Sequence, residues 1–383
     1  MGAIIFVGRE TDAAETRVAA SPETVKKLTS LGCDVTVEEG AGAGSRILDS
    51  DFESAGATIV KAEDVKKADV VLRVRRPSAD DARMMKSGAI LLTQMDPYGN
   101  EEALKPFAEA GVTAFAMELM PRITRAQSMD VLSSQANLAG YQAVIEAAAS
   151  FGRAFPMMMT AAGTVPAAKA FVMGAGVAGL QAIATARRLG AAVSATDVRP
   201  AAKEQVASLG AKFIAVEDEE FKAAETSGGY AKEMSKEYQA KQAALVADHI
   251  SKQDIVVTTA LIPGRPAPKL ISADMLKSMR EGSVVVDLAV ERGGNVEGSV
   301  MGEAAKVGGV TVIGYPNLAG RIPASASLLY AKNLLTFLQT MIDKETQEVR
   351  VDMEDELVKA TALTHAGKLV HPGFGGANDK GDA

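Results

Sequence analysis

A glycine-rich turn in the middle of the chain has the spacing typical of a dinucleotide-binding loop. Gly174, Gly176 and Gly179 directly follow an apolar run at 168–173 and open a helical pattern that ends near Gly190. In such a loop the first glycine permits a tight turn, the second lets the backbone approach a pyrophosphate, and the third packs the helix against the sheet. The helix N-terminus then faces the phosphates. The alternative is a tight turn that binds no ligand.

The acid at the end of the next apolar run indicates which dinucleotide is bound. Asp197 ends the run at 192–197, and a carboxylate there bonds the ribose hydroxyls of NAD and repels the 2′-phosphate of NADP. Arg199, two residues further on, could instead accept that phosphate. Because Asp197 ends the strand itself, we expect NAD(H) as the cofactor. Besides the three glycines, the residues expected to bind it at the ends of these two strands are Val177, Ala178, Asp197, Val198 and Arg199.

Polar side chains that follow another strand could orient a nicotinamide ring. Gln127, Asp130 and Ser133 are spaced three residues apart, so they share one face of a turn or helix. Arg122 and Arg125 lie in the same stretch. An arginine–aspartate pair there, beside an amide and a hydroxyl, could hold a polar ring such as a carboxamide. The alternative is a structural ion pair that braces a hinge.

Residues 217–245 form a long polar insertion between two expected strands. Gly228 and Gly229 beside Tyr230 are typical of a flexible lid with an aromatic tip, and we expect 226–232 to order when nucleotide binds. A solvated helical hairpin at the surface is the alternative.

Two further loops follow expected strands. Arg73, Arg75 and Arg76 end a strand in the N-terminal third of the chain, where they could bind an anion or form a solvated basic rim. The loop after 254–259 is expected over the nicotinamide half of the cofactor. Its candidate cofactor-binding residues are Thr259, Ala260, Leu261, Pro263 and Gly264.

The histidines and the single cysteine argue against several kinds of chemistry. A dehydrogenase acting on an alcohol or amine needs a proton acceptor near the reacting carbon, usually His or Lys. The three histidines (His249, His365 and His371) do not follow strands where a substrate is expected, and no cluster has metal-ligand spacing. Cys33 is expected to be an inert core residue. Direct hydride transfer between two nicotinamides fits, because it moves no separate proton.

Strands alternate with helices along almost the whole chain, which predicts α/β architecture with parallel sheets. At 383 residues we expect two doubly wound, Rossmann-like domains with a cleft between them, a helix at 134–150 and an amphipathic helix at 325–342. The first domain would comprise 1–133 plus 321–383, with a disordered tail from Phe374, and the NAD-binding domain 134–320. The expected strands lie at 3–7, 34–38, 57–60, 69–74, 88–93 and 112–116, then at 168–173, 192–197, 211–216, 254–259, 283–288 and 310–315.

Composition excludes other classes of protein. The net charge of −7 gives no attraction to nucleic acids or anionic membranes, and few aromatic residues are available to stack on bases. No apolar run is long enough to span a bilayer, and the N-terminus lacks a signal-peptide pattern.

Several segments resemble one family over nearly the whole chain. Residues 117–122, 125–130, 155–163 and 225–232 are similar to the NAD(H)-binding component (domain I, alpha subunit) of proton-translocating nicotinamide nucleotide transhydrogenase. The resemblance implies that Asp197 binds ribose and that a catalytic set surrounds the nicotinamide. The residues that match this set are Arg122, Gln127, Asp130, Ser133 and, on a mobile loop, Tyr230.

The same resemblance implies a homodimeric subunit that is catalytic only with partners. These would be an NADP(H)-binding subunit that accepts the hydride and membrane-spanning subunits that carry protons. The chain would then be cytoplasmic and peripheral on the inner face of the membrane. A fragment of a longer chain is the alternative to a separate subunit, and an NAD-binding regulatory module is the non-enzyme alternative.

A relation to alanine dehydrogenase provides the alternative enzyme function, an NAD-dependent amino-acid dehydrogenase. Segments 15–22 and 72–77 resemble the substrate-anchoring segments of that family, with Arg17 at its anchoring arginine and Arg75 in place of its lysine. The stretch that matches its catalytic histidine, 92–97, contains no histidine, and Glu291 stands at the position of its acid. These departures from the family's pattern argue against amino-acid chemistry in this chain.

Overall fold

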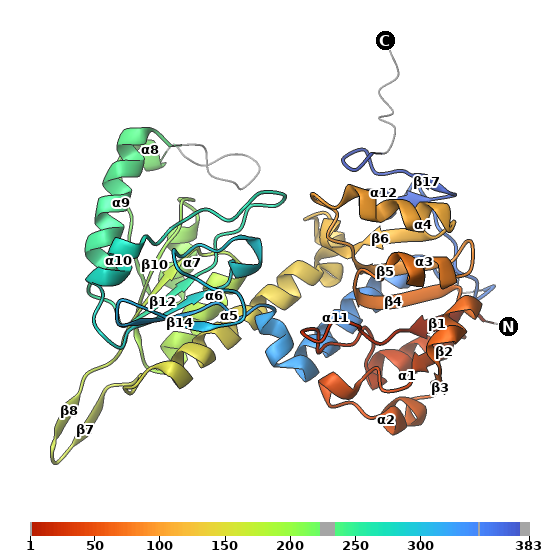
Figure 1. The fold of residues 1–383 in the computed structure, drawn as a ribbon, viewed down its shortest axis with the longest axis horizontal. Helices are drawn as coiled ribbons and strands as arrows, with labels where there is room; N and C mark the ends of the chain where they lie inside the picture. Colours follow the sequence, from red (N-terminus) through yellow and green to blue (C-terminus); the bar gives the residue numbers. More distant parts are fainter. Residues whose placement is uncertain (1, 223–233, 344, 376–383) are drawn as a thin grey trace, which may run out of the picture. The chain divides into compact units, whose positions relative to one another are not determined.

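The chain divides into two compact units, one of which is built from both ends of the sequence (Figure 1). A computed structural model describes residues 2–222, 234–343 and 345–375. Unit 1 comprises Met1–Gln135 and Ala319–Ala383, and unit 2 comprises Ala136–Leu318. The predicted lid at 226–232 and most of the predicted disordered tail lie outside the described residues.

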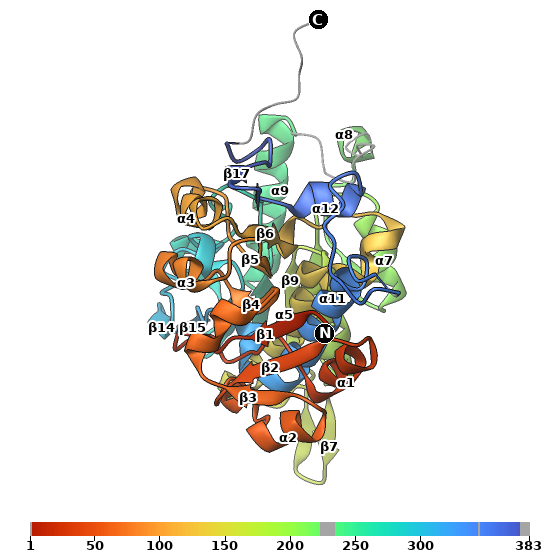
Figure 2. The same ribbon diagram turned by 90° about the vertical axis from the view of Figure 1, so that its right-hand side faces the viewer.

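The sheet of unit 1 is parallel and doubly wound. Its strand order is β3-β2-β1-β4-β5-β6, which Figure 2 shows from bottom to top. From β1 the chain winds outward through β2 to β3, and from β4 it winds in the other direction through β5 to β6. The carboxyl ends of β1 and β4 therefore lie side by side at the point where such sheets bind ligands. The strands are β1 (Ile4–Val7), β2 (Asp34–Glu38), β3 (Thr58–Val60), β4 (Val70–Arg75), β5 (Ile90–Gln94) and β6 (Thr113–Ala116).

Alternating apolar residues build a core on each face of this sheet. Ile5 and Leu72 belong to one core, whereas Phe6 and Val71 belong to the other. Helices α1 (Pro22–Ser30) and α11 (Pro323–Leu338) pack on the first core, and α3 (Ala79–Met84) and α4 (Lys105–Glu109) pack on the second. The remaining elements are α2 (Asp49–Ser54), α12 (Glu356–Thr361), β16 (Thr364–His365), β17 (Lys368–Leu369) and the 3-10 turns η1 (Ala43–Ser45), η2 (Ala62–Lys67), η3 (Glu101–Leu104), η4 (Met117–Leu119), η5 (Thr124–Met129) and η7 (Leu318–Arg321).

The sheet of unit 2 has the same winding with one added edge strand. Its order is β11-β10-β9-β12-β13-β15-β14, parallel except for the antiparallel pair of β14 and β15. The prediction of two Rossmann-like parallel-sheet domains is confirmed. β14 was not among the expected strands, and the strand expected at 211–216 is much shorter. The strands are β9 (Lys169–Met173), β10 (Ala192–Thr196), β11 (Lys212–Phe213), β12 (Ile255–Thr258), β13 (Val284–Asp287), β14 (Ala304–Val307) and β15 (Val310–Ile313).

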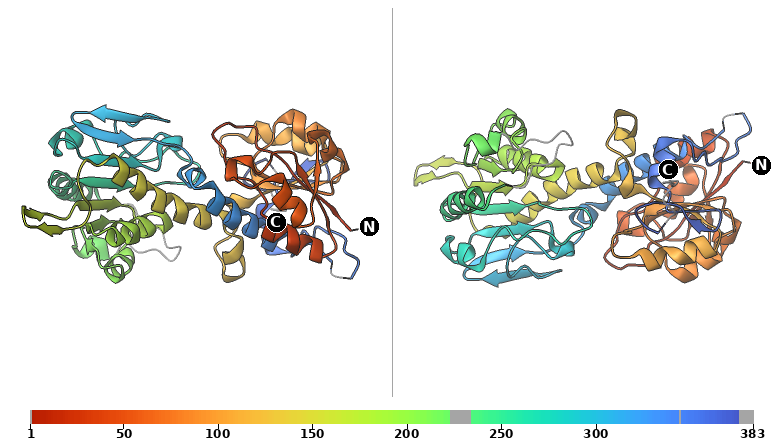
Figure 3. Two further views of the ribbon diagram at one scale, coloured as in Figure 1. Left: turned by 90° about the horizontal axis from the view of Figure 1, so that it is seen from below. Right: turned by 90° about the horizontal axis from the view of Figure 1, so that it is seen from above.

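Helices also cover both faces of the sheet of unit 2. Val172 packs with α5 (Val131–Ser150), which begins in unit 1, and with α6, whereas Phe171 packs with α9 and α10. An antiparallel hairpin of β7 (Met158–Thr160) and β8 (Gly163–Val165) extends away from this sheet (Figure 3). The other elements are α6 (Val177–Arg188), α7 (Ala202–Ser208), α8 (Glu219–Lys222), α9 (Lys236–Ile250), α10 (Ala273–Ser278) and η6 (Val290–Arg292).

Candidate functional site

The glycine-rich turn lies at the carboxyl end of β9, and its geometry explains why two of its glycines are needed. Gly174 has a φ of +104°, and a Cβ there would lie 2.5 Å from the Thr259 hydroxyl oxygen. A Cβ on Gly179 would lie 1.8 Å from the carbonyl oxygen of Gly174, so only glycine lets α6 approach the turn. Both positions therefore keep the backbone in the tight strand–turn–helix form.

Gly176 has a different environment, which fits a phosphate group. A Cβ on this residue would meet no atom within 4 Å. Gly176 is also the N-cap of α6 and has no side chain with which to cap the N–H groups of the first turn. Open space beside uncapped N–H groups at a helix N-terminus suits an anion. Val177 is exposed and Ala178 is partly buried beside it.

Asp197 and Arg199 form an ion pair beside this turn. Arg199 donates through Nε to Asp197 Oδ1 at 2.9 Å and through Nη2 to Oδ2 at 3.0 Å. The backbone N–H groups of Arg199 and Ala175 donate to the same carboxylate at 2.9 and 2.7 Å. These bonds occupy the four acceptor positions of a carboxylate. A ribose hydroxyl must therefore displace a donor before Asp197 can bind it.

Exposure indicates which donor can leave. The Asp197 side chain is 7% exposed and the Arg199 side chain is 34% exposed. The hydrogen bond with Asp197 also raises the pKa of Arg199. A ribose-binding acid and a phosphate-binding arginine were predicted as alternatives, whereas the structure pairs the two side chains. Val198 lies between them with its side chain exposed.

The loop after β12 is held in place by a residue that the sequence analysis missed. The Asn295 amide accepts from the N–H of Ala260 at 3.1 Å and donates to the carbonyl of Ala260 at 2.9 Å. It also donates to Pro268 at 2.8 Å and is fully buried. Asn295 thus fixes both ends of this loop, while Leu261, Pro263 and Gly264 stay exposed. The signal was the Gly293-Gly294-Asn295 turn, since an asparagine after glycines commonly replaces backbone bonds.

The second predicted loop, in unit 1, is built differently from the expectation. Asp130 accepts from the backbone N–H of Ser133 at 2.9 Å and from its hydroxyl at 2.6 Å, so it caps α5. Among the described residues, the arginine of this loop that forms an ion pair is Arg125, with Asp355 and more distantly Glu356. Among the described residues, both oxygens of Asp130 thus bond Ser133 rather than an arginine of the loop.

Buried anchors hold this loop while its polar side chains stay accessible. Ala126 and Met129 are buried, whereas Arg122 and Gln127 are exposed. Asn333 of α11 donates to the carbonyl of Ser128 at 2.8 Å and accepts from the Ser134 hydroxyl at 2.7 Å. Asn333 is a second supporting residue that sequence reasoning missed. Tyr230, predicted to act with this loop, lies outside the described residues.

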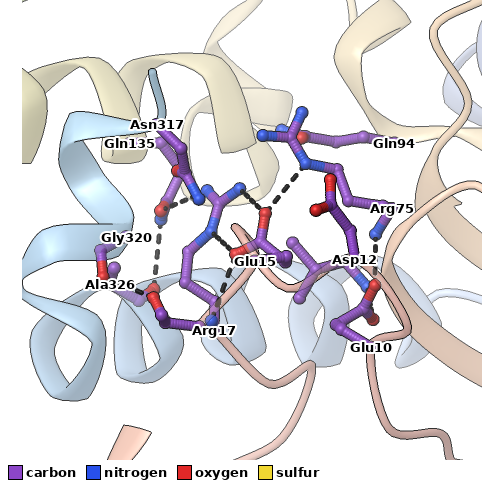
Figure 4. A network of polar contacts seen from close by, with 12 residues as sticks. Glu10, Asp12, Glu15, Arg17, Arg75, Gln94, Gln135, Asn317, Gly320 and Ala326 are labelled. Carbon is purple, nitrogen blue, oxygen red and sulfur yellow. Dashed lines mark hydrogen bonds and ion pairs between the residues drawn. The ribbon is translucent and has the colours of Figure 1, made fainter. Parts of the chain in front are cut away.

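The arginines at the end of β4 are paired with acids. Arg73 contacts Glu10 at 3.2 Å with both side chains buried, and Arg75 contacts Glu15 at 2.8 Å. Arg76 donates to the carbonyls of Met95 and Asp96. Glu15 also binds Arg17 (Figure 4), so the alternative of a solvated basic rim does not hold. The carboxyl end of this sheet carries an ionic cluster instead.

A half-buried acid, Glu118, lies just beyond β6 in the same unit. Burial raises the pKa of Glu118 to about 7, although backbone N–H groups near Asp96 donate to it. In the portion of the chain that the structure describes, its Oε1 accepts from the N–H of Asp96, whereas its buried Oε2 has no hydrogen-bond partner. Asp96 has a φ of +45°, a left-handed conformation that few non-glycine residues adopt.

His249 and Cys33 are held by contacts inside their own units. His249 of α9 bonds the Ser194 hydroxyl and packs on Phe171, and burial lowers its pKa. Cys33 is buried, and burial raises the pKa of its thiol. Over residues 2–222, 234–343 and 345–375, no group of three or more His, Cys, Asp or Glu side chains is placed to hold a metal. In the same ranges no helix has the length and apolarity to cross a membrane.

These observations define the class of protein. A glycine-rich turn at the carboxyl end of β9, followed by an acid at the end of β10, is the arrangement of dinucleotide-binding α/β proteins. Family comparison assigns the chain within this class. The family described as alanine dehydrogenase/PNT matches through its N-terminal domain at residues 6–139 and its C-terminal domain at residues 143–372. The chain belongs to this family.

Individual relatives are transhydrogenases at higher identity and alanine dehydrogenases at lower identity. The crystal structure of transhydrogenase from Sinorhizobium meliloti is 68% identical, with a TM-score of 0.88, and covers 96% of this chain and 100% of its own. The first of the parts that make up NAD(P) transhydrogenase subunit alpha in Rhodospirillum rubrum is 53% identical over 97% of this chain and 99% of its own. A structure of L-alanine dehydrogenase is 25% identical, with a TM-score of 0.80, over 97% and 98%. Both predicted resemblances are confirmed.

Proposed function

We propose that the chain is the NAD(H)-binding component of a proton-translocating transhydrogenase, which passes hydride from NADH to NADP⁺ held by a partner subunit. The observation that carries this proposal is end-to-end similarity to a transhydrogenase alpha subunit, 53% over 97% of this chain and 99% of the relative. The dinucleotide-binding turn in unit 2 supports it independently. Amino-acid dehydrogenation is disfavoured, because 92–97 lacks a histidine and the arginines Arg17 and Arg75 are bound to Glu15.

Unit 2 would bind NADH through the residues described above. The uncapped N–H groups after Gly176 would face the pyrophosphate. Asp197 would bond the ribose once Arg199 has moved, and Arg199 would then be free to contact the nucleotide. The loop of Thr259 to Gly264, fixed by Asn295, would lie beside the nicotinamide half. Bound NADH supplies the hydride, so these residues need only bind and orient it.

The loop of unit 1 would orient the nicotinamide for transfer. We assign this role to Arg122, Gln127, Asp130 and Ser133, together with Tyr230. Support comes from the way the loop is made. Its apolar residues are anchored and Asp130 rigidly caps α5, while Arg122 and Gln127 remain exposed for contact with ligands. A rigid backbone with accessible polar ends suits alignment of two rings.

The proposed partners are an NADP(H)-binding subunit, membrane-spanning subunits and a second copy of this chain. The name of the Rhodospirillum relative, which makes it one portion of an alpha subunit, supports assembly with other subunits. The hairpin of β7 and β8 supports a further protein contact, since Met157, Met158 and Met159 are 61%, 43% and 80% exposed. Exposed apolar side chains gathered on one element commonly mark an interface. We infer a homodimer, held at the cytoplasmic face of the membrane by its partners.

Mixing experiments test this function. The purified chain is combined with an NADP(H)-binding transhydrogenase subunit, and hydride transfer is followed between NADH and an NADP⁺ analogue whose reduced form absorbs at a different wavelength. We expect transfer that requires both proteins, and no NADH formation from alanine plus NAD⁺ with the chain alone. Alanine oxidation without transfer would establish the amino-acid dehydrogenase instead. NADH binding without either reaction would favour a regulatory module.

A further inference from the structure

One buried amide in unit 1 contacts the loop that carries Gln127 and Asp130 at two points. Asn333, on helix α11, is 7% exposed. Its Nδ2 donates to the carbonyl of Ser128 at 2.8 Å, and its Oδ1 accepts from the hydroxyl of Ser134 at 2.7 Å. Both distances are those of good hydrogen bonds, so each end of the amide has a partner in the loop or in the first turn of α5.

These two contacts bracket the side chains proposed to hold the nicotinamide. Ser128 directly follows Gln127, and Ser134 directly follows Ser133. Asp130 lies between the two contacts in sequence and accepts from the N–H and the hydroxyl of Ser133. The contacts span 205 and 199 positions, so the loop is fastened to a helix from the other end of the chain.

The position of Asn333 is itself fixed by the core of unit 1. Its neighbour Leu334 and, one turn further along, Phe337 are fully buried in the core on this face of the sheet. Helix α11 is otherwise largely apolar, and asparagine is a poor helix former because its side chain competes for backbone hydrogen bonds. An asparagine at a buried position of such a helix therefore indicates a specific polar contact.

We propose that Asn333 is a positioning residue for hydride transfer, and that it sets the orientation of the loop that carries Gln127 and Asp130. The inference rests on the proposed function, since hydride transfer is the reaction concerned. Ala126 and Met129 attach the loop through apolar packing, which is non-directional, whereas hydrogen bonds depend on angle. Without Asn333 the loop stays attached but can turn, and a misplacement of about 1 Å can slow transfer by a factor on the order of 10².

Asn333→Leu tests this role, because leucine has a similar length and can make neither hydrogen bond. Hydrogen exchange in peptides that cover 124–134 should become about tenfold faster or more. Single-turnover hydride transfer with saturating partner subunit should slow by a factor on the order of 10 to 10². NADH affinity should stay within about threefold, because the residues proposed to bind the rest of the cofactor belong to unit 2.

Asn333→Asp tests the direction of the two bonds through pH. A protonated carboxylic acid can replace the amide, since it donates to Ser128 and accepts from Ser134, whereas the ionised form cannot donate. Burial disfavours the ionised form and raises the pKa of the introduced acid. The transfer rate of this variant, divided by that of the unaltered protein at each pH, should therefore rise as pH falls from about 8 to about 6. The same ratio for Asn333→Leu should stay constant, and equal pH dependence of the two ratios would overturn the assigned contacts.

Tyr330→Phe is the matched control on the same helix. The Tyr330 hydroxyl is buried and bonds the carbonyls of Arg73 and Val74 in β4, so its loss removes buried hydrogen bonds without removing a contact to the loop. We expect lower stability, with loop exchange and transfer within about twofold of the unaltered protein. Transfer slowed equally by Tyr330→Phe and Asn333→Leu would overturn the positioning role.

The exchange measurement separates this inference from the proposed function. Unchanged loop exchange in Asn333→Leu, or faster exchange with normal transfer, would overturn the positioning role. Absence of transfer by the unaltered protein would refute the proposed function instead, while exchange still decides whether Asn333 holds the loop. If Asn333→Leu does not fold, Ser134→Ala serves in its place, because it breaks the contact with Asn333 Oδ1 by a smaller change.

Discussion

Asp197 in unit 2 and Glu15 in unit 1 are both bound by arginine at the carboxyl end of a parallel sheet, but they differ in what can replace the arginine. Asp197 is paired with Arg199, whose side chain is one-third exposed. Glu15 is paired with Arg17, which is almost fully buried and is held in addition by Gln135. Asp197 can therefore exchange its arginine for a ligand, whereas Glu15 is buried together with Arg17 and cannot.

The difference teaches that the same acid–arginine contact serves binding or stability according to its exposure. Breaking a solvent-accessible pair costs little, because water replaces the lost partner. Breaking a buried pair leaves a charge without compensation. We therefore expect substitutions around Glu15 to change folding and substitutions around Asp197 to change binding, with little effect of either on the other property.

The largest expected effect is on the buried pair. Arg17→Met should lower the free energy of unfolding of unit 1 by about 3–5 kcal/mol, because it removes one of the two arginines that pair with the buried Glu15. Only Arg75 then remains to compensate the carboxylate. NADH affinity should stay within about twofold, because the nucleotide-binding residues belong to unit 2. Urea unfolding and fluorescence titration with NADH measure the two properties. A loss of affinity as large as the loss of stability would break the comparison.

Glu118, a half-buried acid of unit 1, extends the comparison to the pH dependence of stability. The pKa of Glu118 is about 7 in the folded protein, against 4.5 for the exposed group, so the folded state binds more protons between these values. Stability therefore falls as pH rises from about 4.5 to above 7, by about 3 kcal/mol for this group. Glu118→Gln should remove this decline. Urea unfolding at pH 5 and pH 8 measures it, and equal pH dependence in the two proteins would refute the assignment.

Exposed Gln127 should behave in the opposite way. Gln127→Asn shortens a side chain proposed to hold the nicotinamide, and should slow hydride transfer by a factor on the order of 10², since a misplacement of about 1 Å can cost this much. NADH affinity should change less than about tenfold, because other residues bind the rest of the cofactor. Single-turnover transfer with saturating partner subunit measures the rate. Normal transfer in a destabilised protein would instead indicate a structural loop.

The smallest effect is expected at Asp197. Asp197→Ala should weaken NADH binding by about 1–2 kcal/mol, as expected for one charge-assisted hydrogen-bonding site. The unaltered protein should prefer NADH to NADPH in equilibrium dialysis. NADPH binding as tight as that of NADH would contradict the assignment and make Arg199 a phosphate ligand.

Local patterns predicted most of this fold, and the failures have physical reasons. Apolar runs found the buried strands, because such strands must be apolar on both faces. They could not find β14, in which exposed and half-buried positions alternate at an edge, or the hairpin of β7 and β8, whose residues are almost all exposed. Neither element buries enough apolar surface to produce a run.

The candidate site was predictable where its residues are neighbours in sequence. The glycine-rich turn depends on backbone requirements within a few residues. The Glu15–Arg75 contact joins residues 60 positions apart, and Asn295 supports Ala260 across 35 positions. The contacts of Asp130 could not be predicted from sequence spacing, because they depend on the direction of its side chain. That side chain bonds Ser133 rather than an arginine.

Unit 1 is built from two segments at opposite ends of the chain, and this sets the order in which the two units can fold during synthesis. A chain emerging from the ribosome presents 1–135 first, but the core of this segment includes Tyr330 and Phe337 of α11, and Leu363 donates its N–H to Ala114 next to β16. Unit 2 is contiguous and can complete its contacts while the C-terminal segment of unit 1 is still untranslated. The segment that is made first must therefore wait for the one made last, and chaperones that protect exposed strands would act on the N-terminal segment during this interval.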